Sequence, residues 1–326
     1  MMKVIAKGIV HDRSTALIAG VCRTAAGDLL VGYNSGGDLS AGQTASVVRS
    51  RDHGRTWGEP EACFESVFTR GGIEMGCSLS RLQSGRLLMP YADGYYLRPG
   101  SGNFDRRAVL FCPASDDGGA TWSRPRAQSY EGLEAFAFGR VVELPDGDLL
   151  LPLWGAYEKQ GRWIPAVLRS TDAGLTWSGW SPIAEHGDET PIVLLPDGRV
   201  LALLRDYDME DKARPFHVSH SEDGGRTWSP PRRVELAGTS PSLHVTADGR
   251  LLAGYRSTLP GCNCHLASSP DGGLTWQFEL ELELPHGEWS YGGYPMVEDR
   301  PDGRLIAVFH NRVPGWYVGY NILAWD

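Results

Sequence analysis

The stretch from Glu189 to Trp228 reads ETPIVLLPDGRVLALLRDYDMEDKARPFHVSHSEDGGRTW, and it contains two patterns that decide the fold. In the first half, apolar segments flank Asp197-Gly198. Because Asp-Gly supplies the positive φ that a tight turn needs, this half predicts a β-hairpin. The second half ends in the motif SEDGGRTW. Both patterns recur along the chain, so the sequence predicts an array of equivalent units.

The hairpin pattern occurs six times, each time as a Gly in a turn before an aliphatic strand. These glycines are Gly27, Gly85, Gly147, Gly198, Gly249 and Gly303. The second motif stands between successive hairpins and occurs five times, ending at Trp57, Trp122, Trp177, Trp228 and Trp276. Both series repeat at about 50 to 60 residues, the size of a four-stranded propeller blade.

Six hairpins with five intervening motifs predict an all-β fold, a six-bladed β-propeller of four-stranded antiparallel blades. The last blade lacks an outer strand, and the apolar segment Val4–Val10 at the N-terminus is the candidate to supply it. Such pairing would close the ring and remove two open sheet edges. No linker or low-complexity segment divides the chain, so we expect residues 1–326 to form a single domain.

The amino-acid composition limits the kinds of partner that we expect the protein to bind. A formal net charge of -9 makes nucleic acid a poor partner, because phosphate binding needs a basic face. The N-terminal segment contains no apolar run typical of a signal peptide or a membrane span, so we expect a cytoplasmic protein, and a monomer. The cysteines form no CxxC pair, and Cys262-Asn263-Cys264-His265 is too short a pattern to predict a metal site. We expect free thiols, no metal and no cofactor.

The motif S-x-D-x-G-x-T-W resembles the Asp box of the sialidase-like (BNR repeat) superfamily, and the resemblance extends over nearly the whole chain. The Asp carboxylate can accept backbone N–H bonds inside the turn, Gly relaxes the backbone, and the Trp ring packs on the hairpin. We therefore expect structural and not catalytic roles for the box aspartates, Asp52, Asp117, Asp172, Asp223 and Asp271.

Counting residues from each hairpin Gly, here called the register rule, predicts which side chains lie at the functional site. In an antiparallel blade, the start of the first strand and the end of the second lie on the face opposite the hairpin turn, around the central opening. Nine residues before each hairpin Gly stand Ile18, Gly76, Phe138, Glu189, Ser240 and Tyr294. Seven residues after it stand Asn34, Ala92, Trp154, Arg205, Arg256 and His310. The rule predicts a charged and aromatic site assembled from separate repeats.

The family resemblance implies roles for five of these side chains and their neighbours. Glu189 and Arg205 match the family's Glu-to-Arg strand pair, and Tyr294 matches its nucleophilic tyrosine. Arg256 resembles a further arginine of the substrate-binding cluster. Asp38, in the loop of the first repeat, is the nearest match to the acid/base aspartate.

The chain departs from the family in its first repeat. Leu17-Ile18-Ala19 stands where the family has Arg-Ile-Pro, so the third arginine of the cluster is missing from that place. Arg13 or Arg70 could supply a third guanidinium from a loop of the same face. This departure concerns the substrate-binding cluster and not the propeller.

The resemblance implies a retaining exo-glycosidase of sialidase type that releases a terminal acidic sugar, sialic acid or a relative, from a glycoconjugate. A phenol assisted by Glu189 avoids the repulsion between a carboxylate nucleophile and the sugar's own carboxylate. Two alternatives stay open. A glycosidase for neutral sugars, such as arabinan, would use two carboxylates, Glu189 with Glu74 or Glu134. A non-catalytic propeller would bind carbohydrate or protein.

Overall fold

The structure is a computed structural model that describes residues 2–12, 17–35, 41–69, 71–76, 78–96, 106–128, 133–157, 163–205, 207–208, 210, 213–258, 263–313 and 315–325. All regular elements in this part of the chain are β-strands. None of the described residues belongs to a helix long and apolar enough to span a membrane. The expected all-β class is confirmed.

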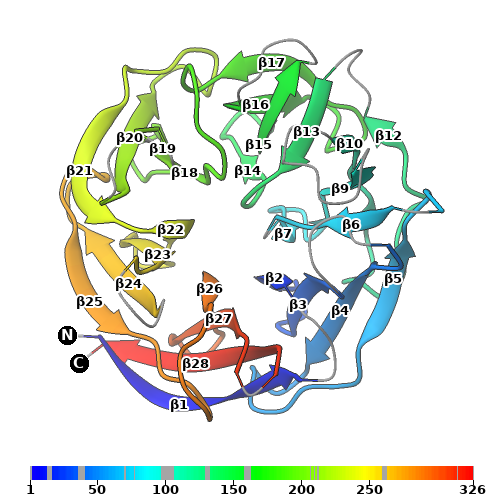
Figure 1. Ribbon diagram of the computed structural model, residues 1–326, viewed down its shortest axis with the longest axis vertical. Coiled ribbons are helices and arrows are strands. Elements are labelled where there is room, and N and C mark those ends of the chain that lie inside the picture. Colours follow the sequence, from blue (N-terminus) through cyan, green and yellow to red (C-terminus); the bar gives the residue numbers. More distant parts are fainter. Residues whose placement is uncertain are drawn as a thin grey trace.

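The strands pair antiparallel in sequence order, mostly in sheets of four. The first such sheet contains β2 (Leu17–Arg23), β3 (Leu29–Asn34), β4 (Thr44–Ser50) and β5 (Glu61–Glu65). A later one contains β18 (Ile192–Leu194), β19 (Val200–Leu204), β20 (Pro215–Ser221) and β21 (Arg232–Ala237). The next contains β22 (Thr239–Val245), β23 (Leu251–Arg256), β24 (Cys264–Ser269) and β25 (Gln277–Glu281). Figure 1 shows the sheets arranged around a common centre, with β2, β18 and β22 as the innermost strands of these three sheets.

The second repeat is interrupted. One sheet contains β6 (Gly72–Glu74), β9 (Tyr91–Tyr96), β10 (Arg106–Phe111) and β12 (Ala127–Gln128), and a smaller one contains β7 (Ser80–Arg81), β8 (Leu87–Leu88) and β11 (Ala114–Ser115). Pro90 and Pro113 stand where the paired strands break, because proline has no N–H to donate to a ladder. A bond from Met89 N to Pro113 O, 3.0 Å, bridges the two parts.

The third repeat pairs β15 (Leu149–Tyr157) with β13 (Leu133–Ala137), β14 (Val142–Glu143) and β16 (Ile164–Ser170), with β17 (Ser178–Pro182) outermost. The split between β13 and β14 leaves residues 138–141 outside the ladder. Arg140 in this short segment reaches the inner strands of other sheets.

Both ends of the chain meet in one sheet, in the order β1-β28-β27-β26. It contains β26 (Gly293–Asp299), β27 (Leu305–Asn311), β28 (Tyr317–Trp325) and β1 (Met2–His11). The strand expected over residues 4–10 thus occupies the outer position, with Met2 opposite Trp325 and His11 opposite Val318. Figure 1 shows the two termini side by side at the edge.

The box turns use their carboxylates locally. Asp223 Oδ1 accepts bonds from Arg226 N at 3.0 Å and Thr227 N at 2.9 Å, and Oδ2 accepts the Thr227 hydroxyl at 2.6 Å. These bonds, the hydroxyl bond first, lower the pKa of Asp223 below its usual range. Of the box tryptophans, Trp177 is buried at 6% exposure, whereas the Trp228 ring is half-buried.

Neighbouring sheets are linked by long polar side chains that bind box carbonyls. Arg49, directly before a box Ser, donates to Gly118 O of the next box at 2.8 Å, and His220 lies 2.7 Å from Gly272 O in the same way. Arg300 Nε donates to His53 O at 2.8 Å and so links β26 to the first box. Apolar clusters fill the space between the sheets, as where Val10, Leu29 and Ile306 meet.

Candidate active site

Tyr294 and Glu189 are 105 residues apart in sequence and in direct contact. Tyr294 lies on β26 and Glu189 three residues before β18, each nine residues before its hairpin Gly. The Tyr294 hydroxyl donates to Glu189 Oε1 at 2.6 Å. Glu189 is buried, with 8% of its surface exposed. A carboxylate at this distance can accept the phenolic proton, so the pair has the geometry of a nucleophile and its base.

Arg205 fixes the carboxylate from the other side. Its Nη1 donates to Glu189 Oε2, while Nε and Nη2 make a two-point contact with Asp188 at 2.8 and 2.5 Å. Burial lowers the pKa of Arg205, but the charges of Glu189 and Asp188 outweigh burial and raise it well above its usual value. The guanidinium therefore stays charged and holds Glu189 with one oxygen toward Tyr294.

The sequence analysis missed Asp188. The sequence offered a signal, because Asp188 directly precedes Glu189. In the structure, the Asp188 N–H pairs with Arg205 O at 3.4 Å, so Asp188 and Arg205 lie at the same level of one sheet. Successive strand residues normally point to opposite faces, which argues against two carboxylates meeting one arginine. These residues lie before the first residue of β18, where that alternation no longer applies.

Arg256, the last residue of β23, approaches the site from the next sheet. Its Nε donates to Thr239 Oγ1 at 2.9 Å, its Nη1 lies 3.4 Å from Gly292 O, and its charge lies over the Tyr291 ring at 4.7 Å. Among the residues that the structure describes, no carboxylate pairs with Arg256. Arg205, in contrast, is bound to two. Arg256 is therefore the better candidate to bind an anion from outside.

Tyr294 has an unusual backbone. Its φ is +49°, and the β26–β27 pairing shifts register between Gly293 and Met296. Ser240, at the same register position on β22, has φ +52° within a similar shift. Positive φ in a bulky residue costs energy that the surrounding contacts must offset. Bulges of this kind redirect a side chain, and here the bulge directs the phenol across the centre to Glu189.

An aromatic wall supports the phenol. The Phe138 ring centre lies 6.0 Å and the His310 ring centre 5.5 Å from that of Tyr294. Burial, helped by the charge of Arg256, lowers the pKa of His310 to about 3, so this imidazole is neutral at physiological pH. Trp154 stacks on Phe136 at 4.6 Å behind Phe138. The register rule had placed Phe138, Trp154 and His310 at this level.

Several sequence-based candidates lie outside the described residues. They are Asp38, the acid/base candidate, the third-arginine candidates Arg13 and Arg70, and Cys262. Glu134, the alternative carboxylate on β13, forms an ion pair with Arg107 at 2.5 Å, and Glu74 is buried on β6. In the described part of the chain no group of His, Cys, Asp and Glu is arranged to hold a metal. His265 lies 3.5 Å from Glu281 instead.

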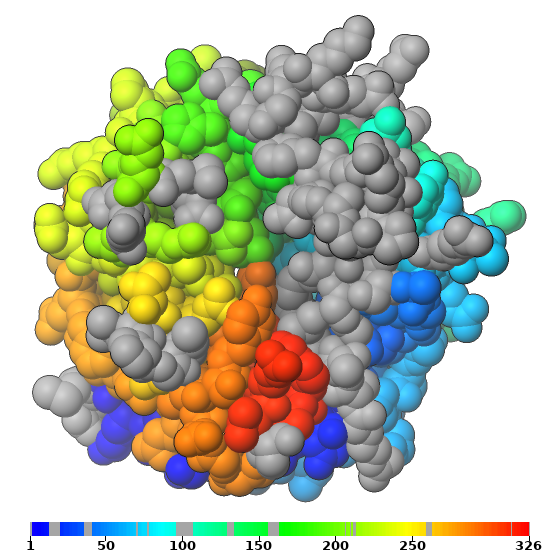
Figure 2. Space-filling view, in the orientation of Figure 1, coloured from blue at the N-terminus to red at the C-terminus, as the bar shows by residue number. Residues whose placement is uncertain are grey.

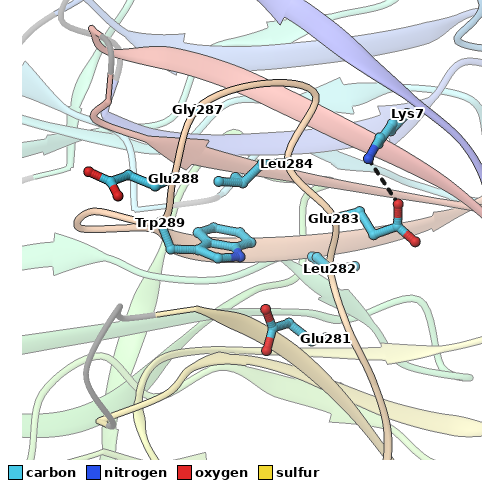
Figure 3. A pocket seen from close by; sticks show the side chains of 8 residues that line it. All are labelled: Lys7, Glu281, Leu282, Glu283, Leu284, Gly287, Glu288 and Trp289. Atoms are coloured by element: carbon cyan, nitrogen blue, oxygen red, sulfur yellow. Dashed lines mark hydrogen bonds and ion pairs between the residues drawn. The ribbon is translucent and has the colours of Figure 1, made fainter.

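Figure 2 shows the segment containing β26, the strand of Tyr294, reaching the middle of this face. A cleft of about 530 Å³ lies elsewhere, beside the outer strand β1 (Figure 3). Trp289 and Leu284 line it, and Lys7 pairs with Glu283 at 3.0 Å across its edge. It brings together no tyrosine and base, so we place the candidate active site at Tyr294.

Repeated four-stranded antiparallel sheets around a centre, with a Tyr–Glu–Arg group between them, define an all-β repeat protein with a polar central site. The chain belongs to the BNR repeat-like domain family, which matches residues 95–305. This confirms the sialidase-like (BNR repeat) superfamily expected from the boxes.

One relative is a sialidase of Micromonospora viridifaciens, 28% identical over 338 residues, which cover 92% of this chain and 50% of the sialidase. The chain thus spans about half the length of that relative. Among solved structures, a protein of unknown function from Dyadobacter fermentans has a TM-score of 0.84 at 20% identity, covering 100% of this chain and 99% of its own. The intramolecular trans-sialidase from Ruminococcus gnavus, in complex with oseltamivir carboxylate, has a TM-score of 0.72 at 14% identity, covering 98% and 97%. These two likenesses show the fold.

Proposed function

We propose that this protein is a retaining exo-glycosidase of sialidase type that releases a terminal acidic sugar from a glycoconjugate. The observation that carries the proposal is the 2.6 Å bond from the Tyr294 hydroxyl to Glu189, whose other oxygen is held by Arg205. A phenol is a poor nucleophile at neutral pH because its ordinary pKa is about 10, so it needs a proton acceptor in contact. Glu189 is that acceptor.

The reaction follows in two balanced steps. In the first, Tyr294 Oη attacks the anomeric carbon, its proton passes to Glu189, and the bond to the leaving oxygen breaks as Asp38 protonates that oxygen. In the second, Asp38 takes a proton from water, the water oxygen attacks the same carbon, and the phenolate leaves and recovers its proton from Glu189. Two displacements at one carbon retain its configuration.

The substrate class is supported by Arg256. A guanidinium at the site without a carboxylate partner among the described residues suits a carboxylate on the sugar, which it can bind with a charge-assisted bond. A tyrosine nucleophile fits the same substrate, since a sugar with a carboxylate at its anomeric carbon would repel a carboxylate nucleophile. Sialidases with a tyrosine nucleophile are a known departure from the two-carboxylate scheme.

We also infer that the scaffold is a single six-bladed propeller over residues 1–326, closed by β1. The pairing of β1 with β28, the Arg300 contact to the first box, and the apolar cluster between the terminal sheet and the first sheet support this inference. A closed ring would hold β18 and β26, which are separated by the sheet of β22, at a fixed separation.

A second candidate is a glycosidase for neutral sugars. Glu74 on β6 and Glu134 on β13, buried in two successive sheets, are the carboxylates it would use with Glu189. The ion pair of Glu134 with Arg107 makes it less free to act as an acid, which favours the first proposal.

A panel of aryl glycosides tests both candidates. We expect turnover of aryl α-sialosides or related acidic sugars, and loss of nearly all of it in Tyr294→Phe and Glu189→Gln, with ligand binding retained. Glu134→Gln is the matched control and should keep the wild-type rate. Turnover of neutral arabinosides that survives Tyr294→Phe would replace the proposal with the second candidate, and a fully folded protein without any turnover would favour a binding propeller.

A further inference from the structure

Arg140 lies at the centre of the ring and contacts three other sheets. It belongs to the segment between β13 and β14, outside any ladder. Its Nη2 donates to Val21 O on β2 at 2.6 Å and to Val297 O on β26 at 2.8 Å. Its Nη1 lies 3.0 Å from His244 Nδ1 on β22. One side chain thus joins the inner strands of the first, third and last two repeats.

Carboxylates complete the cluster. Arg140 Nη2 forms an ion pair with Glu298 Oε2 at 3.1 Å, and His244 Nε2 lies 2.9 Å from Asp299 Oδ2. Because arginine only donates, His244 Nδ1 must accept, so its other nitrogen carries the hydrogen that binds Asp299. Burial acts to raise the pKa of Asp299, but the hydrogen-bond donors around it, His244 first, outweigh burial and lower the pKa. Each of these contacts ends on β22 or β26.

The Arg140 segment and β26 run alongside each other. Phe138 packs on the ring of Tyr294, and two residues further on Arg140 binds the backbone and side chain at Val297 and Glu298. Strand β26 begins in a bulge with Tyr294 at positive φ, so the strand ladder alone does not fix the start of the strand. The contacts of residues 138–140 fix it from the centre.

The cluster also separates the site from the other mouth of the ring. Arg140 and His244 form one end of a cleft of about 230 Å³, whose walls are apolar residues such as Ile192 and Leu243. Glu298 and Asp299 stand five and four residues before the hairpin Gly, and Tyr294 stands nine before it. The Arg140 cluster therefore lies on the hairpin side of Tyr294 and forms the floor beneath it.

We propose that Arg140 is a positioning residue for Tyr294: by holding Val297 and Glu298 of β26, it sets where the phenol meets Glu189. This inference rests on the proposed function for its effect on catalysis, but its effect on the phenol can be measured without substrate. An arginine is required because two separate nitrogens reach β22 on one side and β2 with β26 on the other. Lysine offers one point of charge and cannot span these partners.

The test compares Arg140→Met and Arg140→Lys with Arg49→Met. Arg49 is the matched control, since it also joins one carboxylate, Asp28 at 3.0 Å, to a carbonyl of the next sheet, and it contacts neither β26 nor the site. The melting temperature of each variant measures how much the removed contacts contribute to stability. We expect Arg140→Met to lower kcat by about tenfold to a hundredfold, as a small displacement of a reacting group does, with KM changed by less than about threefold. The kcat of Arg140→Lys should lie between those of the wild type and Arg140→Met, and Arg49→Met should keep the wild-type kcat.

A second readout needs no turnover. In protein labelled with ¹³C at the tyrosine Cζ, the resonance absent from Tyr294→Phe identifies Tyr294. We expect this resonance to shift in both Arg140 variants and to stay in place in Arg49→Met. An unmoved resonance in folded Arg140→Met, or equal loss of kcat in Arg49→Met, would overturn the positioning role. If the wild type hydrolyses no glycoside but the resonance shifts as expected, the positioning of Tyr294 stands and the proposed function fails.

Discussion

Replacing Arg205 by Met removes a cation that bridges two carboxylates, the buried Glu189 and the partly buried Asp188. In the structure, Arg205 bridges Asp188 and Glu189, and the exposed fractions of the three side chains are 16%, 18% and 11%. Met keeps the length and the packing of the side chain but donates nothing. The variant leaves two like charges side by side, away from water, with Tyr294 as the neighbour of one of them.

The size of the effect follows from this burial. Removing one partner of a buried ion pair costs about 3 to 5 kcal/mol, because the remaining charge stays uncompensated. One of the two carboxyl groups can escape that cost by binding a proton at a pH where both are ionised in the wild type. The stability loss should then be largest near neutral pH, and should shrink as the pH falls through the ordinary carboxyl range near about 4.

Two measurements check this reasoning. Urea unfolding at several pH values should show the loss of stability and its decrease toward acid. In the pH–rate profile the acidic limb should move upward, because a protonated Glu189 cannot accept the proton of Tyr294. Arg169→Met is the control: its ion pair with Asp148, at 2.7 Å and with 16% and 20% exposure, is equally buried but remote from the site. An acidic limb that moves no further than in this control would refute the role of Arg205.

Three further predictions concern the ligand, the closure and the boxes. Arg256→Ala should weaken binding of a sugar acid by about 1.5 to 3 kcal/mol and of a neutral analogue much less; equal losses in calorimetry would exclude an anion contact. Deleting residues 1–11 should expose the outer edge of β28 and cause unfolding or aggregation, and unchanged melting would contradict closure by β1. Trp177→Ala should cost about 3 to 5 kcal/mol and the half-buried Trp228→Ala less, both with normal kcat in the folded protein.

The repeats were predictable because their signals are local. Each hairpin needs a Gly at positive φ, as at Gly198 with φ +89°, and each box turn needs an Asp whose carboxylate accepts the following N–H groups. Interactions within a few residues leave their pattern in the sequence itself. The breaks within the second repeat, at Pro90 and Pro113, also have a local cause, but the repeat period by itself does not reveal them.

The sequence predicted the height along the strands at which the site lies, but not the individual contacts within it. Counting residues from the hairpin Gly placed Glu189, Tyr294, Phe138 and His310 at one height, because equivalent strands of a repeat share one register. Counting could not show that a bulge turns Tyr294 inward.

Nor could register counting indicate Arg140, which lies between two strands and binds three other sheets, since it follows no repeat. The residues that depart from the repeat pattern are the ones that make contacts at the central site. Equivalent sheets supply equivalent positions, whereas a site needs one acid, one base and one nucleophile, so its contacts must come from departures. In this protein the departures are Asp188 and Arg140, and both act on the bond between Tyr294 and Glu189.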